Sequence, residues 1–282
     1  MTGGNEASKG RGFDVLSNET RRRVLEVLAE RLRRSPEDPT LGFSDLRRRV
    51  GVRDSGNFNY HLTKLRGRFV TKSDGGYRLA PAGLEVVTAL LTGVYGADAE
   101  LDPLELEEPC PACGATLTAT YEEGLLRFVC PNDHPFQNAL APGAVADRTL
   151  AEVIEVWTLK TRHDLAKTVE GVCPFCYAPL EIAASVEPTD GMPEVSTQCV
   201  RCGVIVTVPV IVPFTWHPAV AAFYHDHGTD VRTRPLWAPE FYDPVEVTAD
   251  PDADLFRVSV ELDGRTLRGS VNDSLSVVDV TR

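Results

Sequence analysis

Residues 54–65 read DSGNFNYHLTKL, and this stretch decides the fold of the N-terminal part of the chain. Asp54 is a favourable helix N-cap, and Phe58, Leu62 and Leu65 recur at the spacing that places side chains on one helical face. The opposite face carries hydrogen-bonding groups and a single cation, namely Ser55, Asn57, Asn59, Tyr60, Thr63 and Lys64. We therefore expect an amphipathic helix whose apolar face enters a core and whose polar face stays accessible.

Two further helices are expected before residue 54. The first opens at the cap candidates Ser17 and Asn18 and has an apolar face formed by Val24, Leu25, Leu28 and Leu32. The second begins at the cap Ser44 and stops at Gly51, because glycine readily takes the conformation that ends a helix.

A hairpin and a fourth helix are expected after residue 65. Asp74-Gly75 separates residues 69–72 from residues 77–79, and Asp-Gly favours a tight turn between two strands. A fourth helix follows Pro81. Three helices followed by a hairpin form a winged helix-turn-helix, whose third helix reads base edges and whose wing contacts phosphates. The predicted DNA contacts are therefore the six polar residues of the third helix together with Lys72 and Arg78 of the wing.

The same segments resemble ArsR-like winged-helix transcription regulators. LSNETRR at 16–22 is similar to their first helix, NYHLTKL at 59–65 to their recognition helix, and the hairpin running into LAPAG at 79–83 to their wing. The resemblance covers about the first third of the chain and implies binding to double-stranded DNA. Metal-sensing members carry cysteines in this region, whereas the first cysteine here is Cys110, so metal sensing is not implied. A winged helix used only for protein contacts is the alternative.

The charge distribution favours a DNA-binding N-terminal domain. Residues 1–80 contain 17 Lys and Arg against 10 Asp and Glu, a net charge of +7. The whole chain carries −12, so residues 81–282 carry −19. Arginine runs at 21–23 and 47–49 are expected to contact phosphates, although they would also suit solvated helix faces. Only 5 of the 29 basic residues are lysine, and this bias with the acidic excess resembles proteins of salt-accumulating haloarchaea.

Seven cysteines and one histidine form two ligand cassettes. In each, two short-spaced ligand pairs are separated by a strand-containing segment, as in a zinc ribbon. The expected Zn²⁺ ligands are Cys110, Cys113, Cys130 and His134 at the first site and Cys173, Cys176, Cys199 and Cys202 at the second. Both sites are expected to be structural. The odd number of cysteines disfavours disulfides, the paired cassettes disfavour a thioredoxin-like redox site, and iron–sulfur binding is an alternative that His134 disfavours.

Three weaker patterns complete the chain. Residues 147–168 are expected to form a helix capped by Asp147, and the apolar run 204–212 is expected to form a buried strand. Residues 216–228 predict a short helix, and residues 245–280 an antiparallel meander with turns at Asp263-Gly264 and 272–274. His225 and His227 stand two residues apart and would point in different directions on a helix, so they are not expected to share a metal.

The sequence thus predicts an α+β protein with a winged helix-turn-helix, two zinc ribbons, and a small C-terminal helix plus antiparallel β meander. The expected parts are a disordered arm (1–12), the DNA-binding domain (13–95), an acidic linker (96–109), ribbon 1 (110–146), a connecting helix (147–170), ribbon 2 (171–213) and the helix-plus-meander region (214–282). No apolar run spans a bilayer and no signal peptide is recognised, so a cytoplasmic location without membrane contact is expected.

The expected function is sequence-specific transcription regulation by a homodimer that associates through helices flanking the wing and binds two half-sites. An adaptor similar in kind to archaeal transcription factor E, which joins a winged helix to a zinc ribbon and acts on RNA polymerase, is the alternative. RNA polymerase or an effector is the further partner expected. No Ser-His-Asp set, phosphate-binding glycine loop or paired-carboxylate pattern stands out, so an enzyme is not expected, and thiol catalysis is the weakest interpretation.

Overall fold

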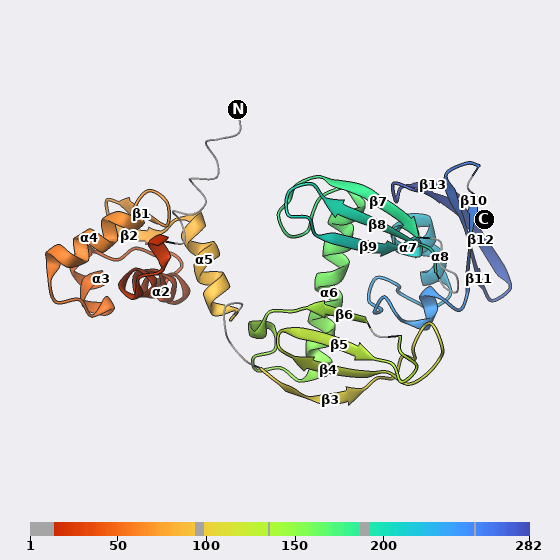
Figure 1. The fold of residues 1–282 in the computed structure, drawn as a ribbon, viewed down its shortest axis with the longest axis horizontal. Helices are drawn as coiled ribbons and strands as arrows, with labels where there is room; N and C mark the ends of the chain where they lie inside the picture. The colour runs from red at the N-terminus through yellow and green to blue at the C-terminus, as the bar shows by residue number, and fades with distance from the viewer. Residues whose placement is uncertain (1–13, 94–98, 135, 187–191, 251) are drawn as a thin grey trace. The chain divides into compact units, whose positions relative to one another are not determined.

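The computed structural model describes residues 14–93, 99–134, 136–186, 192–250 and 252–282 (Figure 1). The arm expected over 1–12 and the first three residues of the expected linker, 96–98, lie outside the described residues. The fold is a mixed α+β arrangement of helices and antiparallel sheets. Its contacts divide the chain into two compact units, residues 1–97 (unit 1) and residues 98–282 (unit 2).

Unit 1 is built from four described helices and one hairpin. These are α2 (Glu19–Arg34), α3 (Phe43–Val50), α4 (Ser55–Leu65), β1 (Val70–Ser73), β2 (Gly76–Leu79) and α5 (Pro81–Leu91). Asn18 caps α2 and Asp54 caps α4, each by accepting a hydrogen bond from a backbone N–H of the first turn. Ser44 was expected to cap α3, but the helix begins one residue earlier and its N-cap position is Gly42.

The core of unit 1 lies between α2, α3, α4 and the hairpin. Phe58, Leu62 and Leu65 of α4 are fully buried, as their spacing predicts, against Leu25 and Leu46. Gly83 lets α5 approach the hairpin, because a Cβ there would lie 2.1 Å from the carbonyl oxygen of Phe69. The consequence is an α4 whose inner face is fixed by packing and whose outer face is exposed.

Unit 2 begins with a four-stranded antiparallel sheet. Its strands pair in the order β3 (Leu101–Glu105), β4 (Thr118–Glu122), β5 (Leu125–Val129) and β6 (Phe136–Ala139), followed by the short 3₁₀ helix η1 (Pro142–Ala144). The expected linker over 96–109 is therefore wrong in part, since its residues 101–105 form β3. Leu101 and Leu104 explain the difference, because both pack against the buried core of this sheet.

Helix α6 (Leu150–Val169) connects two hydrophobic cores of unit 2. Leu150, Val153 and Trp157 pack with the β3–β6 sheet, whereas Leu165 belongs to the larger C-terminal core. The expected cap Asp147 is wrong: Asp147 has a positive φ of 60°, and the N-cap is Thr149. Thr149 and Glu152 form a reciprocal capping box, which satisfies two backbone N–H groups that helix formation leaves without partners.

A second sheet and a buried helix follow α6. Strands β7 (Leu180–Val186), β8 (Glu194–Cys199) and β9 (Ile205–Pro209) pair in sequence order. The strand expected over 204–212 ends at Pro209, and Ile211–Trp216 form helix α7 instead. Helix α7 is buried against the next sheet, where a Cβ on Gly269 would lie 2.7 Å from the Phe214 ring. The domain boundary expected at 213/214 is therefore also wrong, because it falls inside α7.

The C-terminal part contains helix α8 (Pro218–Asp226), the 3₁₀ helix η2 (Pro239–Phe241) and a four-stranded meander. The meander strands pair in the order β10 (Val245–Asp250), β11 (Leu255–Leu262), β12 (Arg265–Asn272) and β13 (Val277–Thr281), as the alternating pattern predicts. Their inner faces share one core with α7, α8 and β8. No described helix combines the length and hydropathy needed to cross a bilayer.

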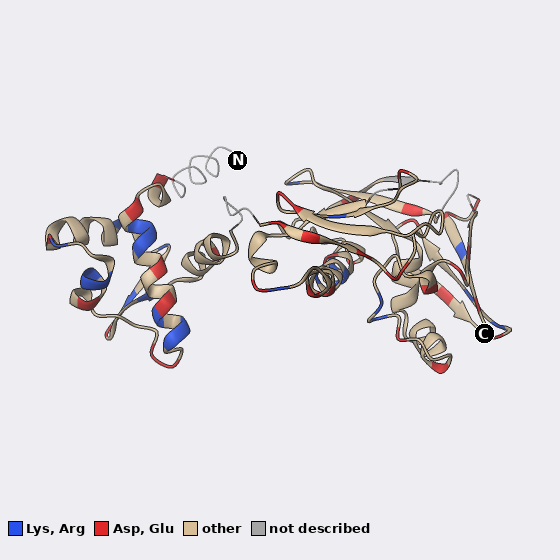
Figure 2. Cartoon of the chain, turned by 90° about the horizontal axis from the view of Figure 1, so that it is seen from below, with Lys and Arg blue, Asp and Glu red and all other residues tan. Residues whose placement is uncertain are grey.

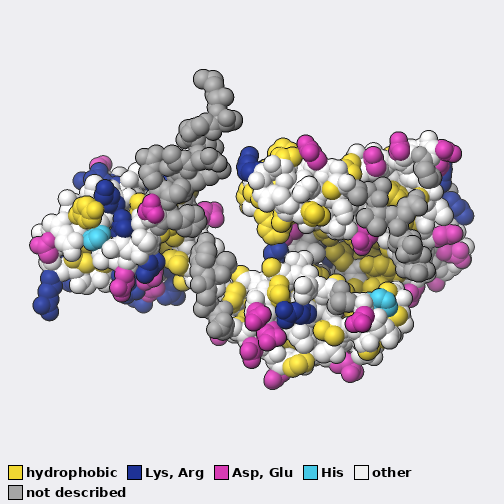
Figure 3. Space-filling model, viewed as in Figure 1, with side chains coloured by type: hydrophobic (Ala, Val, Ile, Leu, Met, Phe, Trp, Pro, Cys, Tyr) yellow, Lys and Arg dark blue, Asp and Glu magenta, His cyan; other side chains and the backbone are white. Residues whose placement is uncertain are grey.

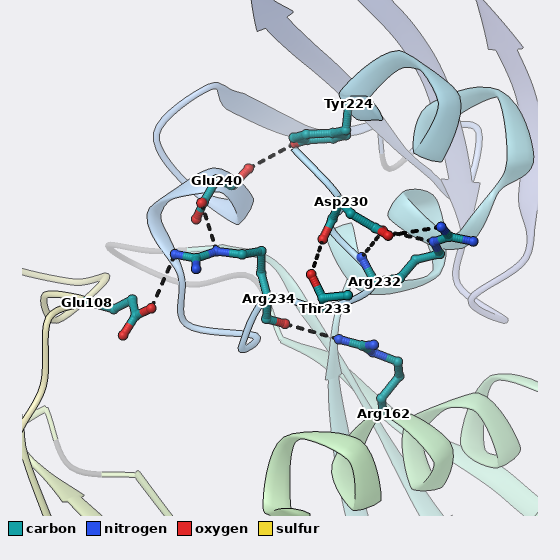
Figure 4. Close-up of polar contacts among 8 residues, drawn as sticks. All are labelled: Glu108, Arg162, Tyr224, Asp230, Arg232, Thr233, Arg234 and Glu240. Atoms are coloured by element: carbon teal, nitrogen blue, oxygen red, sulfur yellow. Dashed lines mark hydrogen bonds and ion pairs between the residues drawn. The ribbon is translucent and has the colours of Figure 1, made fainter. Parts of the chain in front are cut away.

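A polar network holds the irregular segment between α8 and β10 (Figure 4). Arg234 pairs with Glu240 of η2 at 2.9 Å and with Glu108 at 3.2 Å, and its carbonyl oxygen accepts a hydrogen bond from Arg162 of α6 at 3.1 Å. The Tyr224 hydroxyl of α8 donates to the Glu240 carbonyl oxygen at 2.9 Å. These contacts hold the segment to α6, to α8 and to Glu108, which lies three residues after the end of β3.

We predict that Phe58→Ala destabilises unit 1 by about 3–5 kcal/mol, because it leaves a cavity between α4 and its neighbours. Hydrogen exchange of the α2 and α4 amides in the full chain measures the change. Tyr60→Ala is the matched control, since Tyr60 lies on the exposed face of the same helix and should change stability by less than about 1 kcal/mol. Equal effects of the two substitutions would contradict the assigned inner face.

Candidate metal centres and exposed polar surface

The first metal centre lies where β5 ends beside the turn that follows β3. Its donors are the thiol sulfurs of Cys110, Cys113 and Cys130 and a ring nitrogen of His134, all within 4.8 Å of one another. Cys113 Sγ lies 3.5 Å from Cys130 Sγ, and His134 Nδ1 lies 3.8 Å from Cys110 Sγ and 3.7 Å from Cys130 Sγ. The structure therefore brings together the four residues that the first cassette predicts.

The second centre lies between the end of α6 and the turn that joins β8 to β9. Cys173, Cys176, Cys199 and Cys202 place their sulfurs within 4.8 Å of one another. Cys173 Sγ and Cys202 Sγ are 3.7 Å apart, and Cys176 Sγ and Cys199 Sγ are 3.4 Å apart. All four residues of the second cassette converge on one point.

A repeated backbone turn explains why the short-spaced cysteines converge. In three of the ligand pairs, the residue after the second cysteine has a left-handed conformation: φ is 71° at Gly114, 58° at Tyr177 and 73° at Gly203. Its N–H returns to the carbonyl oxygen of the first cysteine at 2.8, 3.0 and 3.0 Å respectively. We call this turn a knuckle. It directs both sulfurs to the same side, and in the fourth ligand pair Asp133 supplies the positive φ before His134.

These distances suit a metal ion and not a disulfide. A metal–sulfur bond of about 2.3 Å in tetrahedral geometry separates two sulfurs by about 3.8 Å, whereas a disulfide bond is about 2.05 Å long. The seven cysteines are free thiols. Each set offers four candidate ligands, the number that a tetrahedral metal ion takes.

Nearby N–H groups favour the thiolate form at two of the candidate ligands, Cys113 and Cys199. The Asn132 side-chain amide, with Nδ2 3.4 Å from Cys113 Sγ, lowers the pKa of the Cys113 thiol to about 6. The backbone N–H groups of Cys202 and Arg201, each 3.4 Å from Cys199 Sγ, lower the pKa of the Cys199 thiol to about 6. Asn132 is absent from the sequence prediction, although its place inside the Cys-x-x-x-His loop is a signal for such a role.

The polar residues singled out in unit 1 lie on its surface. Ser55, Asn57, Asn59, Tyr60, Thr63 and Lys64 are all exposed on α4, and Lys72 and Arg78 are exposed on the hairpin. Among the residues that the structure describes, the ion pairs of unit 1 involve none of Lys64, Lys72 and Arg78. Helix α4 contains no Asp or Glu (Figure 2). The outer face of α4 therefore combines hydrogen-bonding groups with one cation, Lys64, and the hairpin adds Lys72 and Arg78, none of which has a counter-charge among the described residues.

Several arginines expected to contact phosphates are used inside the chain. Arg22 donates to the carbonyl oxygens of Leu16 and Ser17, Arg23 pairs with Glu26, and Arg48 pairs with Asp45. Arginines from both runs, 21–23 and 47–49, therefore make contacts within unit 1. The cations of the α4 end and hairpin are better placed to contact a polyanion.

Two histidines, one at each end of α8, contact residues of the same helix. His227 Nδ1 lies 2.7 Å from the carbonyl oxygen of Phe223, and its ring packs 4.6 Å from the Phe223 ring. His217 accepts a hydrogen bond from the N–H of Ala219 and so caps α8. These contacts give the histidines a structural part in holding the helix ends.

Comparison with known families assigns the chain to one of them. Residues 107–277 match the model described as Domain of unknown function (DUF7351), and residues 10–90 match the model described as Domain of unknown function (DUF7347). Because the first match covers more than half of the chain, the protein belongs to the DUF7351 family. Both metal centres lie inside that match. Searches of the curated proteins and of the solved structures returned no match.

We predict that the purified protein holds two metal ions per chain and that Cys199→Ser holds one. Loss of the second ion should expose the peptide bonds around 171–209 to proteolysis while unit 1 stays protected, because a centre with so small a core depends on its metal. Elemental analysis and limited proteolysis make the measurement. Ser196→Ala, on the same strand, is the control. Two ions retained in Cys199→Ser would contradict the assigned ligands.

Proposed function

We propose that the protein is a sequence-specific, double-stranded DNA-binding regulator of transcription. In this proposal, unit 1 is a winged helix-turn-helix of the ArsR-like kind, α4 enters a major groove and the β1–β2 hairpin is the wing. The observation that carries the proposal is the two-sided character of α4. Its inner face is fully buried, and its outer face presents Asn59, Thr63 and Lys64 to solvent without any acidic residue.

The chemistry of the exposed groups supports a division between base and phosphate contacts. Asn59 lies mid-helix, and an asparagine amide can make two hydrogen bonds to adenine in the major groove. Lys64 lies in the last turn of α4 and Lys72 on β1, where flexible ammonium groups suit phosphates. The net charge of +7 over residues 1–80, against −19 for the rest, directs a polyanion to this part of the chain.

A homodimer is part of the proposal. A groove between α2 and α5 has both charged and apolar lining residues, and the apolar ones include Leu32, Leu84 and Leu91. Apolar side chains that gather on one surface can mark a contact with another protein, and here Leu84 and Leu91 are 45% and 74% exposed beside the same groove. A second copy of the same surface would bury them and set two α4 helices for a two-fold symmetric DNA site.

We further propose that both metals are Zn²⁺ and that both centres are structural zinc ribbons. Three thiolates with one imidazole, and four thiolates, are the ligand sets that tetrahedral zinc takes in closed sites. An iron–sulfur cluster suits the first set less well because of His134. Iron in place of zinc by elemental analysis would contradict this assignment.

Genome-wide crosslinking and sequencing of bound DNA tests the regulator against the adaptor alternative. A shared palindromic motif at bound sites is expected. Occupancy that follows RNA polymerase across the genome without a motif would contradict the regulator and favour the adaptor.

We predict that substitutions on α4 and the hairpin fall into two classes. Asn59→Ala should cost about 1–3 kcal/mol on the preferred sequence and relax the preference at one base pair. Lys64→Ala and Lys72→Ala should weaken binding to all sequences alike and flatten the dependence on salt. Duplex-binding titrations at several KCl concentrations measure both, with Arg265→Ala of unit 2 as the charge control. Wild-type binding by an Asn59→Ala, Lys64→Ala variant would refute the proposed reader.

We also predict that Leu84→Glu with Leu91→Glu yields a monomer, because two carboxylates would be buried in the dimer. Sedimentation velocity measures the mass, and binding to a two-half-site duplex should weaken while binding to a single half-site persists. Val278→Glu, on an exposed position of β13, is the control. A dimer that survives both substitutions would place the interface elsewhere.

A further inference from the structure

The two CPxC knuckles differ in what they show to solvent. Residues 110–114 read CPACG, and residues 173–177 read CPFCY, so the second has Phe175 in place of alanine and Tyr177 in place of glycine. Phe175 has 57% and Tyr177 71% of its surface exposed. Neither ring contributes to the small buried core of this metal centre.

The backbone gives no reason for a tyrosine at position 177. Its φ of 58° lies in the left-handed region, which glycine adopts freely and a residue with a Cβ adopts at a cost. The matching positions of the other two knuckles are Gly114 and Gly203. A strained, exposed tyrosine at a position that favours glycine points to a use for its side chain.

Each ring is paired with a cation from α6. Lys160 Nζ lies 5.8 Å from the centre of the Phe175 ring, and Lys167 Nζ lies 5.9 Å from that of Tyr177. These are two of the five lysines in the chain, and residues 81–282 as a whole carry a net charge of −19. Asp164 pairs with both lysines at 2.7 and 3.1 Å and so positions them.

The neighbouring knuckle extends this surface. Arg201 donates to the carbonyl oxygen of Cys176 at 3.3 Å and adds a third cation to this surface. Val200 and Ile205, beside the knuckle, are also exposed. In Figure 3, hydrophobic side chains and a Lys or Arg side chain gather at the left end of the β7–β9 region. We name the set Phe175, Tyr177, Lys160, Lys167 and Arg201 the aromatic knuckle.

We propose that the aromatic knuckle binds single-stranded DNA. Bases stack on the Phe175 and Tyr177 rings, and phosphates pair with Lys160, Lys167 and Arg201. Each ring has a lysine ammonium beside it, at 5.8 and 5.9 Å, so a strand whose bases stack on the rings would have cations available for its phosphates. Binding of single-stranded DNA at the aromatic knuckle does not require unit 1. The choice of DNA over RNA rests on the proposed function, in which unit 1 of the same chain binds DNA.

The test uses the full, metal-loaded chain carrying Asn59→Ala and Lys64→Ala, so that unit 1 contributes little. Fluorescence anisotropy with labelled fifteen-nucleotide oligothymidylate in about 0.15 M KCl gives the affinity. Adding Phe175→Ala and Tyr177→Gly, which converts the second knuckle to the residues of the first, should weaken binding at least about tenfold. Lys160→Gln with Lys167→Gln should flatten the salt dependence. Arg265→Gln and Val278→Ala are the charge and apolar controls.

Folding and contact are checked separately. The Phe175→Ala, Tyr177→Gly variant should keep two metal ions and the wild-type melting temperature, because glycine suits position 177. Photo-crosslinking of an iododeoxyuridine oligonucleotide should modify the peptide that contains Phe175 and Tyr177.

Three outcomes would overturn the proposal. These are no oligothymidylate binding, binding that the aromatic substitutions leave unchanged, and tighter binding of oligouridylate. A change in sedimentation without a change in oligonucleotide binding would make the surface a contact between copies, and this too would refute it. Duplex binding by the chain with native α4 tests the proposed function separately and does not depend on any of these four outcomes. Failure of the single-stranded DNA proposal can therefore be told apart from failure of the proposed function.

Discussion

The convergence of four donor atoms at each metal centre is the constraint on which unit 2 depends. The second centre has only Cys173, Ala178 and Cys199 as its buried core, and two of these are themselves ligands. Metal–ligand bonds would therefore hold the knuckle end of the β7–β9 sheet, whereas Val195 and Val208 of the same sheet pack into the large C-terminal core. The left-handed knuckle turns set the sulfur positions, and each sheet extends from them. Helix α6 leads from the core of the first sheet into the second knuckle, so its position follows from both.

Aromatic packing and a network of ion pairs join the parts of unit 2 that lie away from the metal centres. The ring centres of Trp157 of α6 and Trp237 of the segment before η2 lie 5.4 Å apart, and both rings contact the Phe128 ring of β5. The same segment is held by Arg234 between Glu108 and Glu240. Residues that are distant in sequence thus meet in one core and one ion-pair network, and the C-terminal meander is joined to the first sheet through them.

Unit 1 and unit 2 divide the chemistry of the chain. Unit 1 is basic, and its exposed α4 is the basis of the proposed DNA reading; unit 2 is acidic, and its cationic groups at the second knuckle stand out against that background. A strongly acidic unit keeps a polyanion away from most of its own surface. Local cations therefore carry more information about binding than the net charge of either unit.

The sequence alone determined the ligand sets and the inner face of α4, because cysteine spacing and helical periodicity are local properties. It also predicted the hairpin and the meander, because Asp-Gly marks the turn of the hairpin and the turn between β11 and β12. Tertiary structure decided what local patterns leave ambiguous. The apolar run 204–212 suits a buried strand or a buried helix equally. Residues 205–209 form β9, whereas residues 211–212 begin helix α7, whose Phe214 packs against β12. Residues 101–105 form strand β3 because they pair with β4 and because Leu101 and Leu104 pack against the core of that sheet. The acidic composition of 96–109 gives no sign of this pairing. Tyr177 beside Lys167 is likewise visible only once α6 and the knuckle lie together.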